Sequence, residues 1–144
     1  MLLRFLIIGN EMRRFLTVKQ YLEKAHDNLE IVVAFGMQCG LKLLDTNEHS
    51  LMLVSLPSED KSVYEVLPLI RQATPIPIIL EAPFWSNEMA QAYNLGADFC
   101  LQEPVGIDDL VGLLNAQYRR LTRISHAEYK KNWFFLQQAP FTSV

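Results

Sequence analysis

A short, uninterrupted apolar run near the middle of the chain constrains the fold more than any other feature. Residues 51–54 are Leu-Met-Leu-Val, and the run is closed by Ser55 and then Pro57. A strand buried on both faces, as in the centre of a parallel sheet, has this pattern, whereas a half-exposed strand alternates apolar and polar residues. We therefore expect 51–54 to be a central strand with Ser55 at its carboxyl end.

Segments typical of strands and helices alternate on both sides of this run. Four further apolar segments are predicted to be strands, at 2–8, 29–35, 76–80 and 99–102. Apolar residues at helical spacing predict helices at 12–22, 37–44, 63–70, 86–95 and 107–121. Asn10 and Ser86 stand where they could cap the helices that follow them, and Gly96 is placed to end the fourth helix.

Five strands that alternate with helices, and that no tight hairpin joins, predict an α/β fold with a parallel, doubly wound sheet. The expected strand order is 2-1-3-4-5, in a flavodoxin-like sandwich of three layers. With 144 residues the chain has room for one such domain, predicted at 1–121, followed by a tail at 122–144. Ligands of such sheets bind at the carboxyl ends of the central strands, here Gly9, Asn10 and Ser55.

Composition excludes several functional classes. The formal net charge is −3, which gives no general attraction to nucleic acids or anionic membranes. Cys39 and Cys100 form no CxxC pair, and the three histidines have no metal-ligand spacing, so we expect a reducing cytoplasm, no metal and no cofactor. No apolar segment is long enough to span a bilayer, and no association with a membrane is expected.

Two motifs resemble those of the receiver domains of bacterial two-component response regulators. Residues 95–104, Leu-Gly-Ala-Asp-Phe-Cys-Leu-Gln-Glu-Pro, resemble the family's LGADDYLxKP, and Tyr64-Glu-Val-Leu67 before Ile70-Arg71 resembles FEVLxxIR. The resemblance covers about 3–120. It implies a receiver fold and a role in signal transduction, and it is strongest to the regulators in which a winged-helix DNA-binding domain follows the receiver.

The resemblance also places the family's functional positions on this sequence. The acidic pair that helps to hold Mg²⁺ falls on Gly9 and Asn10, and counting back ten residues from Glu65 places the phosphoacceptor aspartate on Ser55. The hydroxyl residue of the fourth strand falls on Glu81, or on Ala82 if Pro77 sets the alignment. The lysine before the proline is replaced by Glu103, and the aromatic switch residue falls on Cys100, beside Phe99.

These replacements remove the chemistry of a receiver. Phosphoryl transfer to a receiver needs a carboxylate nucleophile, a divalent ion and a cation that meets the phosphoryl charge. A phosphoryl group would face Glu103, and two like charges about 4 Å apart near a surface repel by about 4 kcal/mol. We therefore expect a degenerate, non-phosphorylated pocket without catalytic residues, formed by Gly9, Asn10, Glu11, Ser55, Glu81, Cys100 and Glu103.

Other interpretations of these residues stay open. Ser55 is either a nucleophile or a buried, hydrogen-bonded hydroxyl, and the absence of a G-x-S-x-G motif favours the hydroxyl. Glu11, Glu81 and Glu103 are either water-facing loop residues or a three-carboxylate cation site. Cys100 is either a small core residue or a redox switch, and core packing is favoured. Phe84 and Trp85 either pack over the site or form a contact patch.

Three functional classes follow. The first is a phosphorylation-independent pseudo-receiver that acts by protein contact, with homodimerisation through the fourth helix, fifth strand and last helix, as in similar receivers. The second is the N-terminal regulatory part of a DNA-binding response regulator, since Arg119, Arg120 and Arg123 stand where a linker would begin. The aromatic tail from Trp133 to Phe141 contains no helix-turn-helix pattern, so this chain itself is not expected to bind DNA. The third, a small enzyme on a flavodoxin-like sheet, has no motif to support it.

Overall fold

The computed structural model describes residues 2–46, 48–57 and 61–142, with side-chain positions as far as Ile124. Its strands are β1 (Leu3–Gly9), β2 (Leu29–Phe35), β3 (Leu51–Ser55), β4 (Ile78–Ala82) and β5 (Phe99–Gln102). Its helices are α1 (Met12–Ala25), α2 (Gly36–Thr46), α3 (Ser62–Ala73), α4 (Glu88–Leu95) and α5 (Ile107–Thr142). Within the described part of the chain, no helix is both long enough and apolar enough to cross a bilayer.

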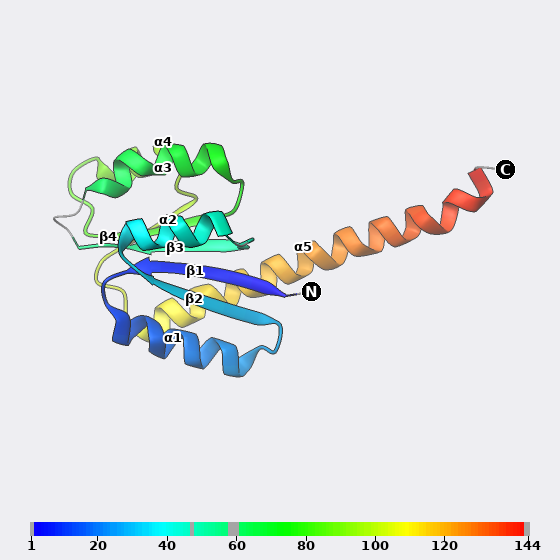
Figure 1. Cartoon of the computed structure of the whole chain (residues 1–144), viewed down its shortest axis with the longest axis horizontal. Coiled ribbons are helices and arrows are strands. Elements are labelled where there is room, and N and C mark those ends of the chain that lie inside the picture. Colours follow the sequence, from blue (N-terminus) through cyan, green and yellow to red (C-terminus); the bar gives the residue numbers. More distant parts are fainter. Residues whose placement is uncertain (1, 47, 58–60, 143–144) are drawn as a thin grey trace. The chain divides into compact units, whose positions relative to one another are not determined.

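All five strands are parallel and lie in the order β2-β1-β3-β4-β5, as predicted. Helix α1 covers one face of the sheet, and α2, α3 and α4 cover the other (Figure 1). The chain divides into two compact units, Met1–Val111 and Gly112–Val144. The first unit holds the whole sheet, helices α1 to α4 and the first turn of α5.

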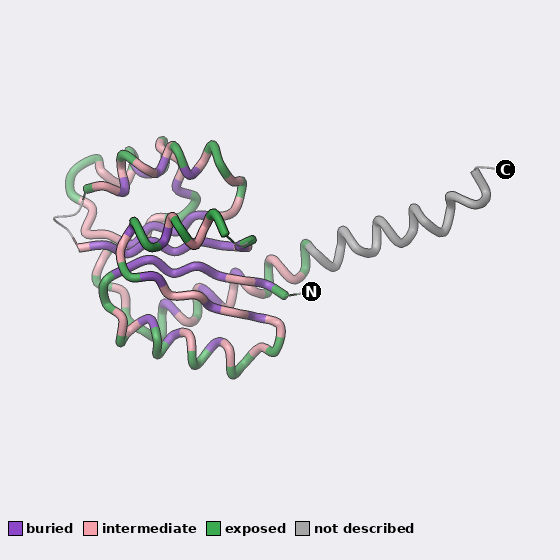
Figure 2. Tube along the Cα trace, in the orientation of Figure 1, coloured by how far each residue is buried: buried purple, intermediate pink, exposed green. Residues whose placement is uncertain are grey.

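The core follows from the alternation of side chains along strands that are covered on both faces. Every residue of β3 is buried, which confirms the two-sided burial expected from its continuous apolar run. Leu6, Ile8, Met52 and Val54 pack with residues of α2, α3 and α4. The alternate residues point to the α1 face and are fully buried there. They are Phe5, Ile7, Leu51, Leu53 and Ile79. The central strands β1, β3 and β4 are therefore the most buried part of the trace (Figure 2).

The two motifs that carry the family resemblance are joined by an arginine. Arg71, at the end of α3, donates to the Asp98 carboxylate at 2.8 Å and to the Gly96 carbonyl at 2.9 Å. Asp98 in turn accepts the backbone N–H of Ile78 at 2.8 Å, at the start of β4. The FEVLxxIR-like and LGAD-like segments therefore form one structural unit that fixes the beginning of β4.

Two predicted helix caps are wrong. The N-cap of α1 is Glu11, because its carbonyl accepts the first helical N–H, from Phe15, at 3.1 Å. Asn10 lies one residue too early to take this role, and the Glu11 side chain makes no cap bond. Helix α4 has Asn87 as its N-cap. Ser86 cannot cap it from its left-handed backbone (φ 53°), since an N-cap residue is ordinarily extended. Gly96 ends α4 as expected, with φ 129°.

Strand and helix ends also differ from the predicted ranges, and one difference matters for function. Strand β4 begins at Ile78, because Pro77 has no N–H to donate, and it extends to Ala82. Glu81 therefore lies inside a central strand and not in the loop where the sequence pattern placed it. Helix α5 runs to Thr142, beyond its predicted end at Leu121, and the side chains of the aromatic tail Trp133–Phe141 lie outside the described residues.

Candidate functional site

Three polar or small residues stand side by side at the carboxyl edge of the sheet. Gly9 of β1 is in register with Ser55 of β3, and Ser55 is in register with Glu81 of β4. All three end or nearly end their strands, so they line the edge at which parallel sheets bind ligands. Of the two alternatives for the fourth-strand position, Glu81 is the residue beside Ser55, whereas Ala82 is paired with Gln102.

The carboxylate of Glu81 is completely buried, and both of its oxygens accept hydrogen bonds. Its side chain is 0% exposed. Its Oε1 atom accepts the Ser55 hydroxyl at 2.6 Å and Nη1 of Arg14 at 2.7 Å, and its Oε2 atom accepts Nη2 of Arg14 at 2.7 Å. The expectation that Glu81 faces water is wrong, and Ser55 is the buried, hydrogen-bonded hydroxyl that the sequence favoured.

Arg14 is the functional residue that the sequence analysis missed. It lies in the first turn of α1 and reaches the site from outside the sheet, with its side chain only 14% exposed. Besides its two bonds to Glu81, it donates to the Val105 carbonyl at 2.7 Å and so joins α1 and β4 to the loop before α5. The hydrogen bond to Glu81 raises the pKa of Arg14 more than burial lowers it, so this cation is permanent.

Above the ion pair lies a pocket of about 120 Å³ lined by Glu11, Arg14, Glu81, Glu103, Pro104 and Val105. Burial raises the pKa of the Glu103 carboxyl, and the charges of Glu81 and Glu11 raise it further, against the opposing effect of Arg14. The three carboxylates share this pocket, but the described residues contain no group of three side chains arranged to hold a metal ion. The two oxygens of Glu81 already bind Arg14 and Ser55.

The raised pKa of Glu103 makes the stability of the domain depend on pH. The native state binds the Glu103 proton more tightly than the unfolded chain does. Above the native pKa the ionised carboxylate therefore destabilises the folded domain, and below about pH 4 the group is protonated in both states and has no such effect. We predict that Glu103→Gln is more stable than the native protein at pH 7, by about 0.5 kcal/mol or somewhat more. The gain should vanish near pH 4 in urea unfolding. A gain that is the same at both pH values, or one also produced by Glu65→Gln on the exposed side of α3, would contradict this assignment.

Two predicted pocket residues lie away from this cluster. Asn10 is exposed, and the hydrogen bonds described around the Arg14–Glu81 ion pair do not include it. Cys100 is in register with Leu80, which belongs to the core on the opposite face of the sheet, and its N–H donates to the Tyr93 hydroxyl at 3.1 Å. Burial raises the pKa of the Cys100 thiol, which agrees with a packed side chain more than with a reactive thiolate. The structure therefore brings together Gly9, Glu11, Ser55, Glu81 and Glu103.

The two aromatic residues after β4 have different surroundings. Phe84 packs against the core on the face covered by α2, α3 and α4. Trp85 is 67% exposed, and its backbone N–H donates to the Glu88 carboxylate at 2.8 Å. Phe84 therefore packs against the core and is not among the residues that line the pocket, and Trp85 is exposed and available for contact.

Comparisons with known proteins agree with this geometry. No protein-family model matches the chain. Over 119 residues it is 29% identical to the response regulator ArlR of Staphylococcus haemolyticus; the matched region is 80% of this chain and 52% of that protein. The chain thus spans about half the length of that relative.

Solved receiver structures share the fold. A CheY-like receiver domain of Methanospirillum hungatei matches with a TM-score of 0.69 and 22% identity, covering 85% of this chain and 98% of that one. A two-component response regulator of Clostridium difficile gives 0.67 and 21%, covering 84% and 96%. HP1043, an orphan response regulator of H. pylori, gives 0.67 and 21%, covering 79% and 94%. The chain therefore has the receiver fold, and its sequence is similar to that of a response regulator.

Proposed function

We propose that this chain is a pseudo-receiver, a receiver domain that regulates by protein contact without being phosphorylated. The observation that carries the proposal is the buried network of Arg14, Glu81 and Ser55. A receiver pocket must be free to admit a divalent ion and a phosphoryl group. Here a guanidinium and a carboxylate satisfy one another at the same edge of the sheet.

The residues around the network support the same proposal. Ser55 has a hydroxyl and not the carboxylate that forms an acyl phosphate, and this hydroxyl already donates to Glu81. Gly9 carries no side chain to hold a metal ion, and Glu103 places a negative charge at the pocket where a phosphoryl group would need a positive one. The protein resembles signalling domains, and we propose no enzymatic activity and no metal or cofactor for it.

The decisive experiment is an amide NMR titration with Mg²⁺ and beryllofluoride, which mimics a phosphoryl group on a receiver carboxylate. We expect no shifts at Ser55, Glu81 or Glu103. A receiver with an intact aspartate, titrated in the same buffer, is the control that must respond. Saturable shifts around Ser55 in this chain would overturn the proposal.

A contact surface for a second copy is proposed at the fourth helix, the fifth strand and the start of the last helix. Tyr93, Phe99 and Ile107 are between 38% and 44% exposed there, which is a high exposure for large apolar side chains. We expect sedimentation velocity to show a dimer that Phe99→Asp weakens. Tyr21→Asp, a similar change at an exposed aromatic residue of α1, is the matched control and should leave association unchanged. A monomer at high concentration would count against this surface.

A second candidate function is the regulatory part of a DNA-binding response regulator. One specific observation favours it: the chain matches only 52% of the response regulator ArlR. A solved structure with the same fold is described as the receiver domain of a DNA-binding response regulator from Colwellia psychrerythraea. Sequencing the transcript beyond codon 144 tests this candidate, which requires a DNA-binding domain in the same reading frame.

A further inference from the structure

Strand β2 lies at the edge of the sheet, where an unpaired strand can add a strand from another chain. Its sequence, Leu-Glu-Ile-Val-Val-Ala-Phe, is rich in β-branched residues and has one charge and no proline or glycine. Exposed edge strands of this composition add further strands from other chains. The domain therefore needs a feature that prevents this addition.

The register shows which backbone groups are available for pairing. The Leu3 N–H donates to the Asn28 carbonyl at 2.8 Å, and β1 and β2 then run parallel in register. Successive residues of a strand direct their backbone N–H and C=O groups to opposite sides. The backbone groups of Glu30 therefore point toward β1, and those of Leu29, Ile31 and Val33 point away from it, to the open edge. The Leu29 N–H is taken by the His26 carbonyl at 3.4 Å, so Ile31 is the next outward position along the edge.

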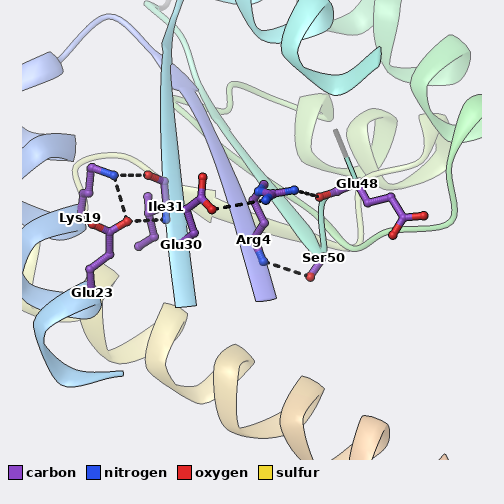
Figure 3. Close-up of polar contacts among 7 residues, drawn as sticks. All are labelled: Arg4, Lys19, Glu23, Glu30, Ile31, Glu48 and Ser50. Carbon is purple, nitrogen blue, oxygen red and sulfur yellow. Dashed lines mark hydrogen bonds and ion pairs between the residues drawn. The ribbon is translucent and has the colours of Figure 1, made fainter. Parts of the chain in front are cut away.

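Both outward groups of Ile31 are occupied by two side chains of α1 (Figure 3). The Ile31 N–H donates to Oε2 of Glu23 at 2.7 Å, and Nζ of Lys19 donates to the Ile31 carbonyl at 2.5 Å. Lys19 also donates to the same Glu23 oxygen at 2.9 Å, because the two residues are one helical turn apart. Burial raises the pKa of Glu23, but the bonds from Ile31 and Lys19 lower it overall, so the carboxylate stays ionised at neutral pH.

This arrangement supplies what a neighbouring strand would supply. An added strand offers each outward residue one acceptor and one donor, and the carboxylate and the ammonium offer Ile31 the same pair. A second chain would have to displace two charge-assisted hydrogen bonds and separate an ion pair in order to pair through Ile31. We propose that Lys19 and Glu23 act as a strand substitute that closes the β2 edge against a second copy of this chain.

Closure of this edge has a consequence for assembly. If copies associate through β5, at the opposite edge of the sheet, pairing through β2 as well would link dimers into open chains. The strand substitute limits association to one edge. Its own test does not depend on whether the β5 surface forms a dimer.

The test compares two double variants of α1. Lys19→Ala with Glu23→Ala removes the strand substitute, and Gln20→Ala with Lys24→Ala makes the same i,i+4 change at exposed positions one residue further along. We expect the Ile31 amide of the first variant to exchange at least about ten times faster than in the control at low concentration. Sedimentation velocity should show concentration-dependent larger species for the first variant alone.

A third variant separates edge pairing from partial unfolding. Phe35, at the end of β2, is 62% exposed, and Phe35→Lys places a charge on the edge strand without changing the core. Adding Phe35→Lys to the Lys19→Ala, Glu23→Ala variant should restore the native sedimentation profile. A charge on the edge strand would block edge pairing but would not refold a partly unfolded domain, so this result distinguishes the two causes. The proposal is overturned if the first variant sediments like the control, or if Phe35→Lys leaves its larger species unchanged.

Discussion

Replacing Arg14 with methionine is expected to lower the free energy of unfolding at pH 7 by about 3 to 5 kcal/mol. Methionine keeps much of the volume of the side chain but removes the cation from a carboxylate that is 0% exposed. Glu81 would then keep only the Ser55 hydroxyl as a partner, and an uncompensated charge would remain in the core. Urea unfolding followed by circular dichroism measures the loss.

The neighbouring arginine provides the control for this prediction. Arg13 is exposed, so Arg13→Met makes the same chemical change on α1 without touching Glu81 and should change stability by about 0.5 kcal/mol or less. Adding Glu81→Gln to Arg14→Met removes the buried charge while keeping an acceptor for Ser55, and should recover at least half of the loss. If Arg14→Met and Arg13→Met are equally stable, the ion pair does not hold this site together.

The fold was predictable because the signals that specify it are local. The continuous apolar run of β3 and the alternation of strand-like and helix-like segments depend on neighbouring residues only, and they predicted the parallel sheet. Its order, β2-β1-β3-β4-β5, is one of the two common orders of doubly wound sheets. Errors fell at element ends: single residues decide where α1 and β4 begin, and α5 continues well beyond its predicted end. Asn10 lies one position before the carbonyl that begins α1, and Pro77 moves the start of β4 by lacking a donor.

The site was less predictable because its central contact is long-range. Glu81 is 67 residues from Arg14 in sequence, and a glutamate at the end of an apolar run looks like the first residue of a loop. One signal was available: Glu81 and Glu103 are predicted to share a pocket in which no cation is predicted, so a cation from elsewhere is needed to balance them. Arg13 and Arg14 both closely follow the predicted pocket residue Glu11 in sequence, and only the folded chain shows that Arg14, not Arg13, reaches the pocket.

Gly9→Asp, which places a carboxylate at the first acidic position of the receiver pattern that the sequence resembles, is the second change expected to have a large effect. A Cβ atom on Gly9 would lie 2.5 Å from the Ser55 carbonyl oxygen and would also collide with the ring of Phe15, which is fully buried. A backbone atom cannot yield as a flexible side chain can, so the strands would have to move apart. We expect a loss of about 3 kcal/mol or more.

Two further variants divide this loss into its causes. Gly9→Ala introduces the Cβ atom alone and should cost about 1 to 3 kcal/mol. Asn10→Asp restores the second acidic position at an exposed residue and should change stability by about 0.5 kcal/mol or less. If Gly9→Asp were tolerated as well as Asn10→Asp, the edge of the sheet would still have room for a metal-binding carboxylate. The packing of Gly9 against Ser55 and Phe15 indicates instead that this edge of the sheet has no room for a side chain at position 9.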